Sequence, residues 1–106
     1  MISFDEFKKV EIKVAKVLEA DRVEGSDKLL KLKISLGSEE RQIVSGIGKN
    51  YEPADMVGKN IIIVSNLEPR QLMGLESQGM ILAASDDSGP AILIPDREIP
   101  PGTEVR

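Results

Sequence analysis

The chain of 106 residues contains no cysteine and no histidine. Without cysteine it can form neither a disulfide bond nor a thiolate metal site, which fits a reducing compartment. Without histidine it lacks the side chain that most often acts as acid, base or metal ligand at neutral pH. No apolar run approaches the roughly 18 residues of a membrane span, and the start lacks the layout of a secretion signal. We expect a soluble, cytoplasmic protein without a cofactor, a metal site or a membrane anchor.

Catalytic arrangements are also missing. The candidate nucleophiles Ser45 and Ser77 have no lysine at Ser-x-x-Lys spacing, and residues 85–90, Ser-Asp-Asp-Ser-Gly-Pro, are typical of a turn rather than of paired catalytic acids. No phosphate-binding loop or dinucleotide motif is present, and the run from Gly46 to Gly48 is too short to be one. The sequence therefore predicts a binding protein and not an enzyme.

The formal net charge of −4 argues at first sight against a nucleic-acid partner, but the charges are unevenly distributed. Residues 28–70 carry seven basic and five acidic groups, whereas residues 71–106 carry two basic and six acidic groups. One face can thus be positive while the whole molecule is negative. An ordinary solvated surface is the alternative, and the charge totals alone favour it.

Short apolar segments punctuated by glycine and proline are typical of an all-β domain. A capping box from Ser3 to Glu6 predicts a short N-terminal helix, and Pro53 with Gly58 brackets a second one. Alternation of apolar and polar residues predicts strands, and a break in parity near 15–17 predicts a bulge in the first. The expected strands cover residues 10–18, 30–36, 41–45, 60–66 and 79–84, before an irregular C-terminal extension. Residues 67–78 are expected to form a loop without regular structure.

This order of elements is that of the OB barrel, which binds oligonucleotides and oligosaccharides. We therefore predict one domain over residues 1–106. It is an all-β, five-stranded OB-fold barrel with a short N-terminal helix, a short helix between strands 3 and 4, and a C-terminal extension.

Two groups of polar residues are candidates for binding. Lysines two apart on one strand face repeat about every 6–7 Å, a distance that matches successive phosphates. An arginine fork can hold phosphate or a guanine edge, and amides can read bases. The strand group is Lys28, Lys31, Lys33 and Arg41, and the loop group is Asn66, Arg70, Ser77 and Gln78. A solvated strand face and ordinary loop polarity are the alternatives.

Aromatic side chains are few, namely Phe4, Phe7 and Tyr51. General binders of single strands stack bases on aromatic platforms, whereas Phe4 and Phe7 are expected to anchor the first helix to the core. The scarcity disfavours single-stranded DNA and leaves a mode that reads shape and phosphates, suited to folded RNA.

Five runs carry a family resemblance that covers the chain from Phe4 to Val105. They are 26–32 Ser-Asp-Lys-Leu-Leu-Lys-Leu, 43–47 Ile-Val-Ser-Gly-Ile, 57–59 Val-Gly-Lys, 66–70 Asn-Leu-Glu-Pro-Arg and 74–82 Gly-Leu-Glu-Ser-Gln-Gly-Met-Ile-Leu. In this order they strongly resemble the tRNA-binding domain of methionyl-tRNA synthetase, which also occurs as a β-subunit and as a stand-alone tRNA-binding protein.

The resemblance implies an OB fold, a homodimer, and tRNA binding that depends on RNA structure and little on sequence. It places the family's binding positions on Lys28, Lys31, Asn66, Arg70, Ser77 and Met80. For Met80 a core strand position is the alternative. The family members from animals carry basic or helical extensions that this chain lacks, so we expect modest affinity per protomer. The apolar, proline-rich tail over residues 92–101 is the candidate dimer interface.

Two other functions stay open at this stage. A related branch of the fold resembles export chaperones that hold unfolded peptides, although that branch lacks the runs at 26–31 and 77–80. The chain could also be an assembly factor that only docks onto a synthetase.

Overall fold

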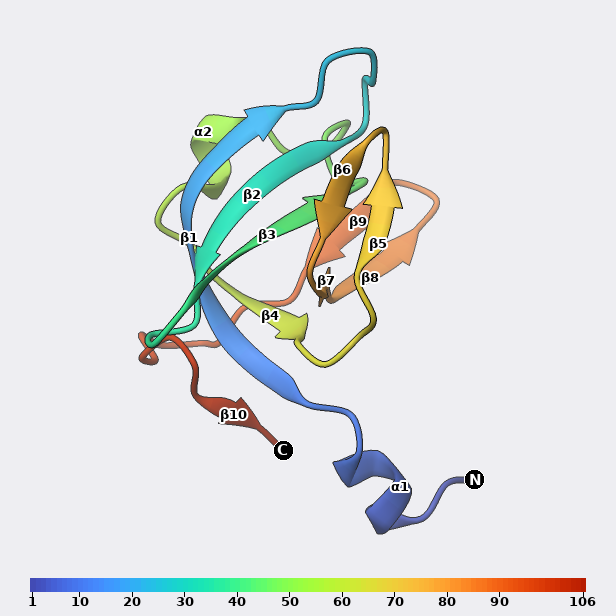
Figure 1. The fold of residues 1–106 in the computed structure, drawn as a ribbon, viewed down its shortest axis with the longest axis vertical. Helices are drawn as coiled ribbons and strands as arrows, with labels where there is room; N and C mark the ends of the chain where they lie inside the picture. Colours follow the sequence, from blue (N-terminus) through green and yellow to red (C-terminus); the bar gives the residue numbers. More distant parts are fainter.

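The computed structural model describes all 106 residues and is built around one curled antiparallel sheet (Figure 1). The strand order in this sheet is β3-β2-β1-β4-β7, and β10 pairs with the first residues of β1. Two hairpins, β5–β6 and β8–β9, stand beside it. The elements are α1 Phe4–Lys8, β1 Ile12–Arg22, β2 Leu30–Ser35, β3 Glu40–Ser45, α2 Pro53–Met56, β4 Asn60–Val64, β5 Arg70–Leu72, β6 Leu75–Ser77, β7 Met80–Ile81, β8 Ala83–Asp86, β9 Gly89–Ile92 and β10 Glu104–Val105.

The long strand β1 organises the barrel because it serves two neighbours in succession. Its first half pairs with β4 from Ile12 to Lys16, and its second half pairs with β2 up to Arg22. The register shifts between Val17 and Glu19, which confirms the predicted bulge, close to its expected place. A bulge bends the strand and increases its twist, so the sheet can close on itself.

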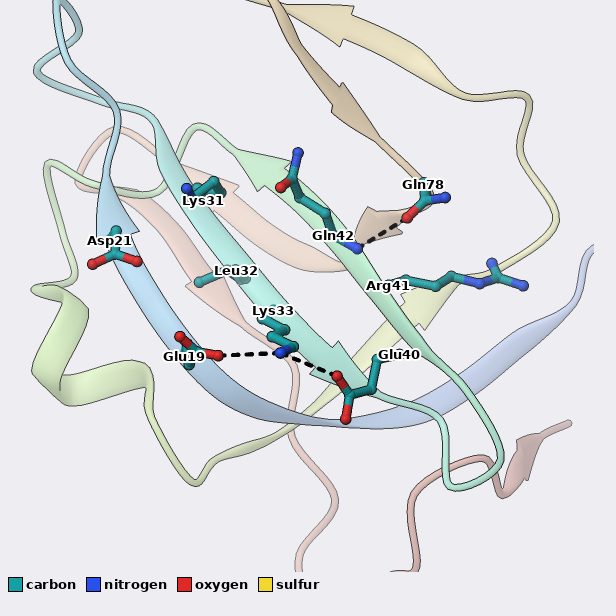
Figure 2. Close-up of a pocket in the computed structure, with 9 residues that line it drawn as sticks. All are labelled: Glu19, Asp21, Lys31, Leu32, Lys33, Glu40, Arg41, Gln42 and Gln78. Carbon is teal, nitrogen blue, oxygen red and sulfur yellow. Dashed lines mark hydrogen bonds and ion pairs between the residues drawn. The ribbon is translucent and has the colours of Figure 1, made fainter.

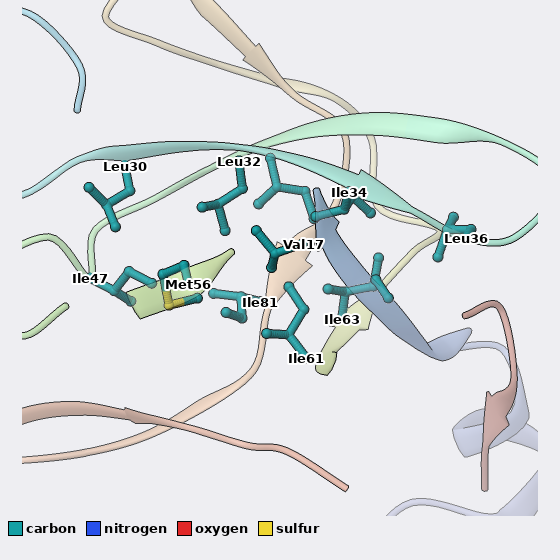
Figure 3. Close-up of a cluster of buried hydrophobic side chains, with 12 residues drawn as sticks. Val17, Leu30, Leu32, Ile34, Leu36, Ile47, Met56, Ile61, Ile63 and Ile81 are labelled. Carbon is teal, nitrogen blue, oxygen red and sulfur yellow. The ribbon is translucent and has the colours of Figure 1, made fainter. Parts of the chain in front are cut away.

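The core lies inside the curl (Figure 3). It contains twelve buried apolar side chains, and the alternating residues Leu30, Leu32 and Ile34 of β2 are fully buried within it. The short helix α2 lies between β3 and β4 in the sequence, and its Met56 is also fully buried. The helix therefore packs against the barrel core through this side chain. The predicted OB-like barrel, both short helices and the alternation of β2 are thereby confirmed.

The segment predicted to be an irregular loop forms a hairpin instead. Strands β5 and β6 pair through Leu72 and Leu75 around a two-residue turn at Met73 and Gly74. Both turn residues have positive φ, 51° and 79°, as the turns that match the twist of hairpin strands require. The prediction failed because this conformation is unusual for methionine, and only Gly74 signals it.

The ends of the chain also differ from expectation. The capping box of α1 is present, but the helix buries no residue, and the Phe4 side chain is 70% exposed. Phe4 and Phe7 are therefore not core anchors, and α1 stands apart from the barrel near β10 (Figure 1). Neither helix is long and apolar enough to cross a membrane.

The C-terminal extension is fastened to the barrel at Gly102. Its amide donates a 2.7 Å hydrogen bond to the Val14 carbonyl oxygen, and the adjacent Thr103 carbonyl accepts from the Val14 amide at 2.9 Å. Gly102 has φ 91°, and a β-carbon there would overlap the Leu36 carbonyl oxygen. Only glycine therefore fits at this junction.

Gly102→Ala should lower the free energy of unfolding by about 2–4 kcal/mol, because left-handed strain and steric overlap add together. Gly58→Ala is the matched control, since Gly58 has φ 89° but open space around it. We expect only the strain there, about 1 kcal/mol. Urea unfolding of both variants measures the difference, and equal losses would show that the contact with Leu36 contributes nothing.

Candidate nucleic-acid interface

One groove gathers three of the residues predicted to bind RNA: Lys28, Arg70 and Met80. We call it the Lys28–Arg70 groove. Its sixteen lining residues come from the β1–β2 loop, the end of β3, the β5–β6 hairpin, β7 with Leu82, and the β8–β9 hairpin. Its volume is about 630 Å³. Segments far apart in the sequence thus form one concave surface.

The β1–β2 loop holds Lys28 by its backbone and leaves its side chain free. The Ser26 hydroxyl accepts hydrogen bonds from the amides of Lys28 and Leu29, at 3.3 and 3.1 Å. The Lys28 carbonyl accepts a 2.6 Å bond from the Gly48 amide. Because a buried neighbour, Leu29, fixes the next position, the exposed ammonium group extends from a defined point.

The β5–β6 hairpin brings Arg70 to the same groove. Its two leucines, Leu72 and Leu75, pack against a small buried cluster of Val23, Leu29 and Val44 on the outer side of the sheet. At the tip, a β-carbon on Gly25 would lie 3.3 Å from Met73 Cε, so the hairpin turn touches the β1–β2 loop. This apolar contact positions the hairpin although its own ladder is only three pairs long.

The charge of the groove is entirely positive. Lys28 and Arg70 are its only charged lining residues, and no acid is among the sixteen. Neither of these two side chains takes part in any of the six ion pairs of the molecule. An uncompensated pair of cations beside a hollow attracts an anion more strongly than the net charge of −4 suggests.

On the outer face of β2 and β3, in contrast, basic side chains are paired with acidic ones (Figure 2). The Lys33 ammonium group lies 3.2 Å from a Glu40 carboxylate oxygen and 3.4 Å from one of Glu19. These carboxylates, Glu40 foremost, raise the pKa of Lys33 above its ordinary value. The lysine therefore stays protonated, and its positive charge is balanced by the two carboxylates. The strand lysine is therefore already neutralised within the protein.

Arg41 is also paired with a carboxylate of the protein. Its guanidinium donates to the Glu39 carboxylate at 3.1 and 3.2 Å and to the Ser65 carbonyl oxygen. This arginine lowers the pKa of Glu39 below its ordinary value, so the pair persists into mildly acidic solution. Lys31 lies opposite Asp21 and Val44 in the ladder, makes no ion pair, and borders the far side of the hairpin tip.

The side-chain amides of Asn66 and Gln78 make hydrogen bonds within the protein. Asn66 accepts a 2.9 Å bond from the Glu11 amide and donates a 2.7 Å bond to the Lys9 carbonyl, tying the segment after α1 to the end of β4. Gln78 accepts from the Gln42 amide at 3.1 Å (Figure 2). These bonds fix the orientation of the exposed Asn66 side chain, which keeps one N–H donor and one oxygen lone pair without a partner in the protein.

Ser77 is buried, with 4% of its surface exposed. Its hydroxyl accepts a 3.0 Å hydrogen bond from the Val44 amide and donates to the Gly79 carbonyl at 3.1 Å. Gly79 approaches the Val64 carbonyl of β4 and not an open surface. These bonds give Ser77 a positioning part, because they fix β6 to β3 and so hold Arg70, its ladder partner. The ligand contact that the resemblance implies for Ser77 stays a prediction.

The groove also contains residues that sequence reasoning missed, chiefly Gly46 and Met73. Gly46 lies in the run 43–47 that carries the family resemblance, but no binding role was assigned to it, and Gly74 was the only sequence signal for the turn that holds Met73. Of the nine predicted residues, three line the groove, Lys33 and Arg41 are paired with carboxylates, and Asn66, Ser77 and Gln78 make internal bonds. Lys31 lies on the strand face without an ion pair.

Ser77→Ala should lower the free energy of unfolding by about 1–3 kcal/mol, because it leaves the buried Val44 amide without its acceptor. Amide hydrogen exchange at Val44 should become faster. Ser85→Ala, at an exposed position, is the control and should change stability by less than about 0.5 kcal/mol. Unchanged stability together with lost RNA affinity would instead make Ser77 a direct ligand contact.

Comparison with known proteins gives a consistent result. The family model described as putative tRNA binding domain matches residues 12–104. The methionine–tRNA ligases of Caldanaerobacter subterraneus subsp. tengcongensis and Thermotoga maritima are 54% and 53% identical over 104 residues. These matches cover 98% of the chain but only 16% of each ligase.

Solved structures match over the full chain. A MetRS-related protein from Pyrococcus horikoshii has a TM-score of 0.94 at 37% identity, covering 100% of this chain and 98% of that one. The chaperone CsaA from Bacillus anthracis has a TM-score of 0.90 at 26% identity, covering 100% and 99%. Because the family model spans the barrel and its C-terminal extension, the chain belongs to the putative tRNA binding domain family.

Proposed function

We propose that the chain binds folded tRNA through the Lys28–Arg70 groove and so supports aminoacylation by a methionyl-tRNA synthetase. It acts as a β-subunit, a detached domain or a factor in trans, in the cytoplasm where tRNA is charged. It performs no catalytic step of its own. The observation that carries the proposal is a groove with two unpaired cations and no lining acid, in a chain of this family.

The ion pairs within the protein support an order among the predicted contacts. Phosphate binding releases counterions, so affinity should fall with salt in proportion to the number of cations engaged. Lys28 and Arg70 are free to contribute, and Lys31 can extend the contact past the hairpin tip. Lys33 and Arg41 would first have to leave their carboxylates, so they contribute less.

Lys28→Ala and Arg70→Ala should each weaken tRNA binding about tenfold, since each removes a charge-assisted contact. Each should also reduce the salt slope by about one. Lys33→Ala is the matched control and should change affinity less than about twofold, because its charge is already compensated. Filter binding over a salt series measures all three, and binding that is absent or independent of salt at micromolar wild-type protein would refute the proposal.

We also infer a homodimer formed at the end of the molecule that carries both termini. Helix α1 exposes Phe4, and a neighbouring apolar groove of about 580 Å³ is lined by residues that include Leu93, Ile94 and Ile99. A two-fold axis lets the helix of each protomer cover the groove of its partner, because an isologous contact uses each surface twice. The tail predicted from the sequence as the interface supplies part of this groove.

Phe4→Ser and Leu93→Ser should convert the dimer to a monomer without unfolding it, since neither side chain is buried in the protomer. Val57→Ser is the control, because Val57 is 50% exposed but lies after α2, outside this groove. Size-exclusion chromatography with light scattering measures the mass. A wild-type monomer at tens of micromolar protein would contradict the inference.

Peptide binding is the second candidate function, favoured by the likeness to the CsaA chaperone. The two free cations of the groove, Lys28 and Arg70, support a polyanionic ligand instead, because the binding of an unfolded peptide does not require two free cations. Suppression of aggregation of an unfolded protein, without tRNA binding, would reverse this order.

A further inference from the structure

The Lys28–Arg70 groove holds more than phosphate binding needs. Nine of its sixteen lining residues are hydrophobic, and its volume of about 630 Å³ lies in the range of sites for small organic ligands. A phosphate group requires donors and cations but gains nothing from an apolar floor. The hydrophobic lining of the groove therefore fits an uncharged, partly apolar group that is attached to an anion.

Gly46 leaves room for such a group. Its φ is not in the left-handed region, and an added β-carbon would meet no atom within 4 Å. The backbone thus does not require glycine at this position for conformation or for packing, unlike at Gly79 or Gly102. The missing side chain leaves an open, exposed space in the wall of the groove beside Ser45.

Two exposed methionines line the same groove. Met73 and Met80 are 58% and 44% exposed, although large apolar side chains usually gain by burial. A thioether is polarisable and makes favourable contacts with aromatic rings. The chain has no tryptophan, and its single tyrosine, Tyr51, packs against the core, where its hydroxyl oxygen accepts a 3.0 Å hydrogen bond from the Ile92 amide. The methionines are therefore the surfaces available for stacking.

Polar side chains also line the groove. The hydroxyls of Ser45 and Ser85 lie among the lining residues and can bond to ring nitrogens or exocyclic groups. Lys28 comes from the β1–β2 loop and Arg70 from the β5–β6 hairpin, and both line the groove, so a phosphate attached to a bound ring would find a cation there. A hydrophobic lining, polar side chains and two cations together match a nucleotide.

We propose that the Lys28–Arg70 groove receives one unpaired base of the bound RNA, stacked against Met73 and Met80 in the space left by Gly46. The proposal rests on the proposed tRNA binding and adds its recognition element, which is an extrahelical nucleotide and not the helix backbone alone. Duplex RNA cannot place a base in the groove without unpairing it. The site therefore distinguishes folded RNA with unpaired bases from a continuous helix.

The test compares two RNA duplexes, identical except that one carries a single bulged nucleotide. Wild-type protein should bind the bulged duplex about tenfold more tightly, the effect of one stacked base. Gly46→Leu should abolish this preference while leaving the salt slope unchanged, because the cations remain. Gly46→Ala should reduce it in part. Unchanged urea midpoints for both variants show that the fold is intact.

The outcomes separate the two proposals. Absence of tRNA binding by the wild type overturns both. Salt-dependent tRNA binding with equal affinity for the two duplexes, or full preference retained in Gly46→Leu, overturns the base site and leaves tRNA binding standing. If amide resonances along the groove respond to an apolar peptide but not to adenosine or uridine monophosphate, the groove is a peptide site and the base site is likewise overturned.

Discussion

The attachment of the β5–β6 hairpin to the outer side of β3 is the contact on which the candidate site depends. One buried hydroxyl, that of Ser77, bonds to the Val44 amide, and Leu72 with Leu75 packs on the cluster around Val44. A two-stranded hairpin of this length is at best marginally stable alone, so its position depends on these contacts. Without them Arg70 and Met73 would have no fixed place, and the wall of the groove would be lost.

Local pairing, and not net charge, decides which cations can serve a ligand. Lys33 has a half-exposed side chain, yet two carboxylates hold it. Lys28 has no acidic partner, although the residue before it, Asp27, pairs with Lys49. Exposed ion pairs contribute little to stability, so the pairing of Lys33 is better understood as limiting where a polyanion can bind. The acidic balance of the chain is thus compatible with one cationic groove.

Much of the fold could be predicted because its signals are local. The alternation of apolar and polar residues at Leu30, Leu32 and Ile34 predicts which side chains are buried. The break in this alternation before Glu19 predicts the bulge. The site was harder, because its parts meet only through tertiary contacts. Sequence spacing placed Lys33 beside Lys31 but could not show that Glu19, from another strand, would neutralise it. The resemblance identified Ser77 as important, but its hydrogen bonds to Val44 and Gly79 depend on the tertiary structure.

Few free cations in one groove imply weak binding by a single protomer, since each phosphate contact contributes a limited share of the affinity. The proposed dimer changes this, because a second groove on the same rigid body binds at a high effective concentration once the first is occupied. Both grooves can be filled only by a partner whose unpaired bases and phosphates already lie at the matching distance. A preshaped RNA satisfies this condition without any particular base sequence, whereas a flexible strand must first lose conformational entropy. Selection for shape therefore follows from the combination of weak sites and fixed geometry.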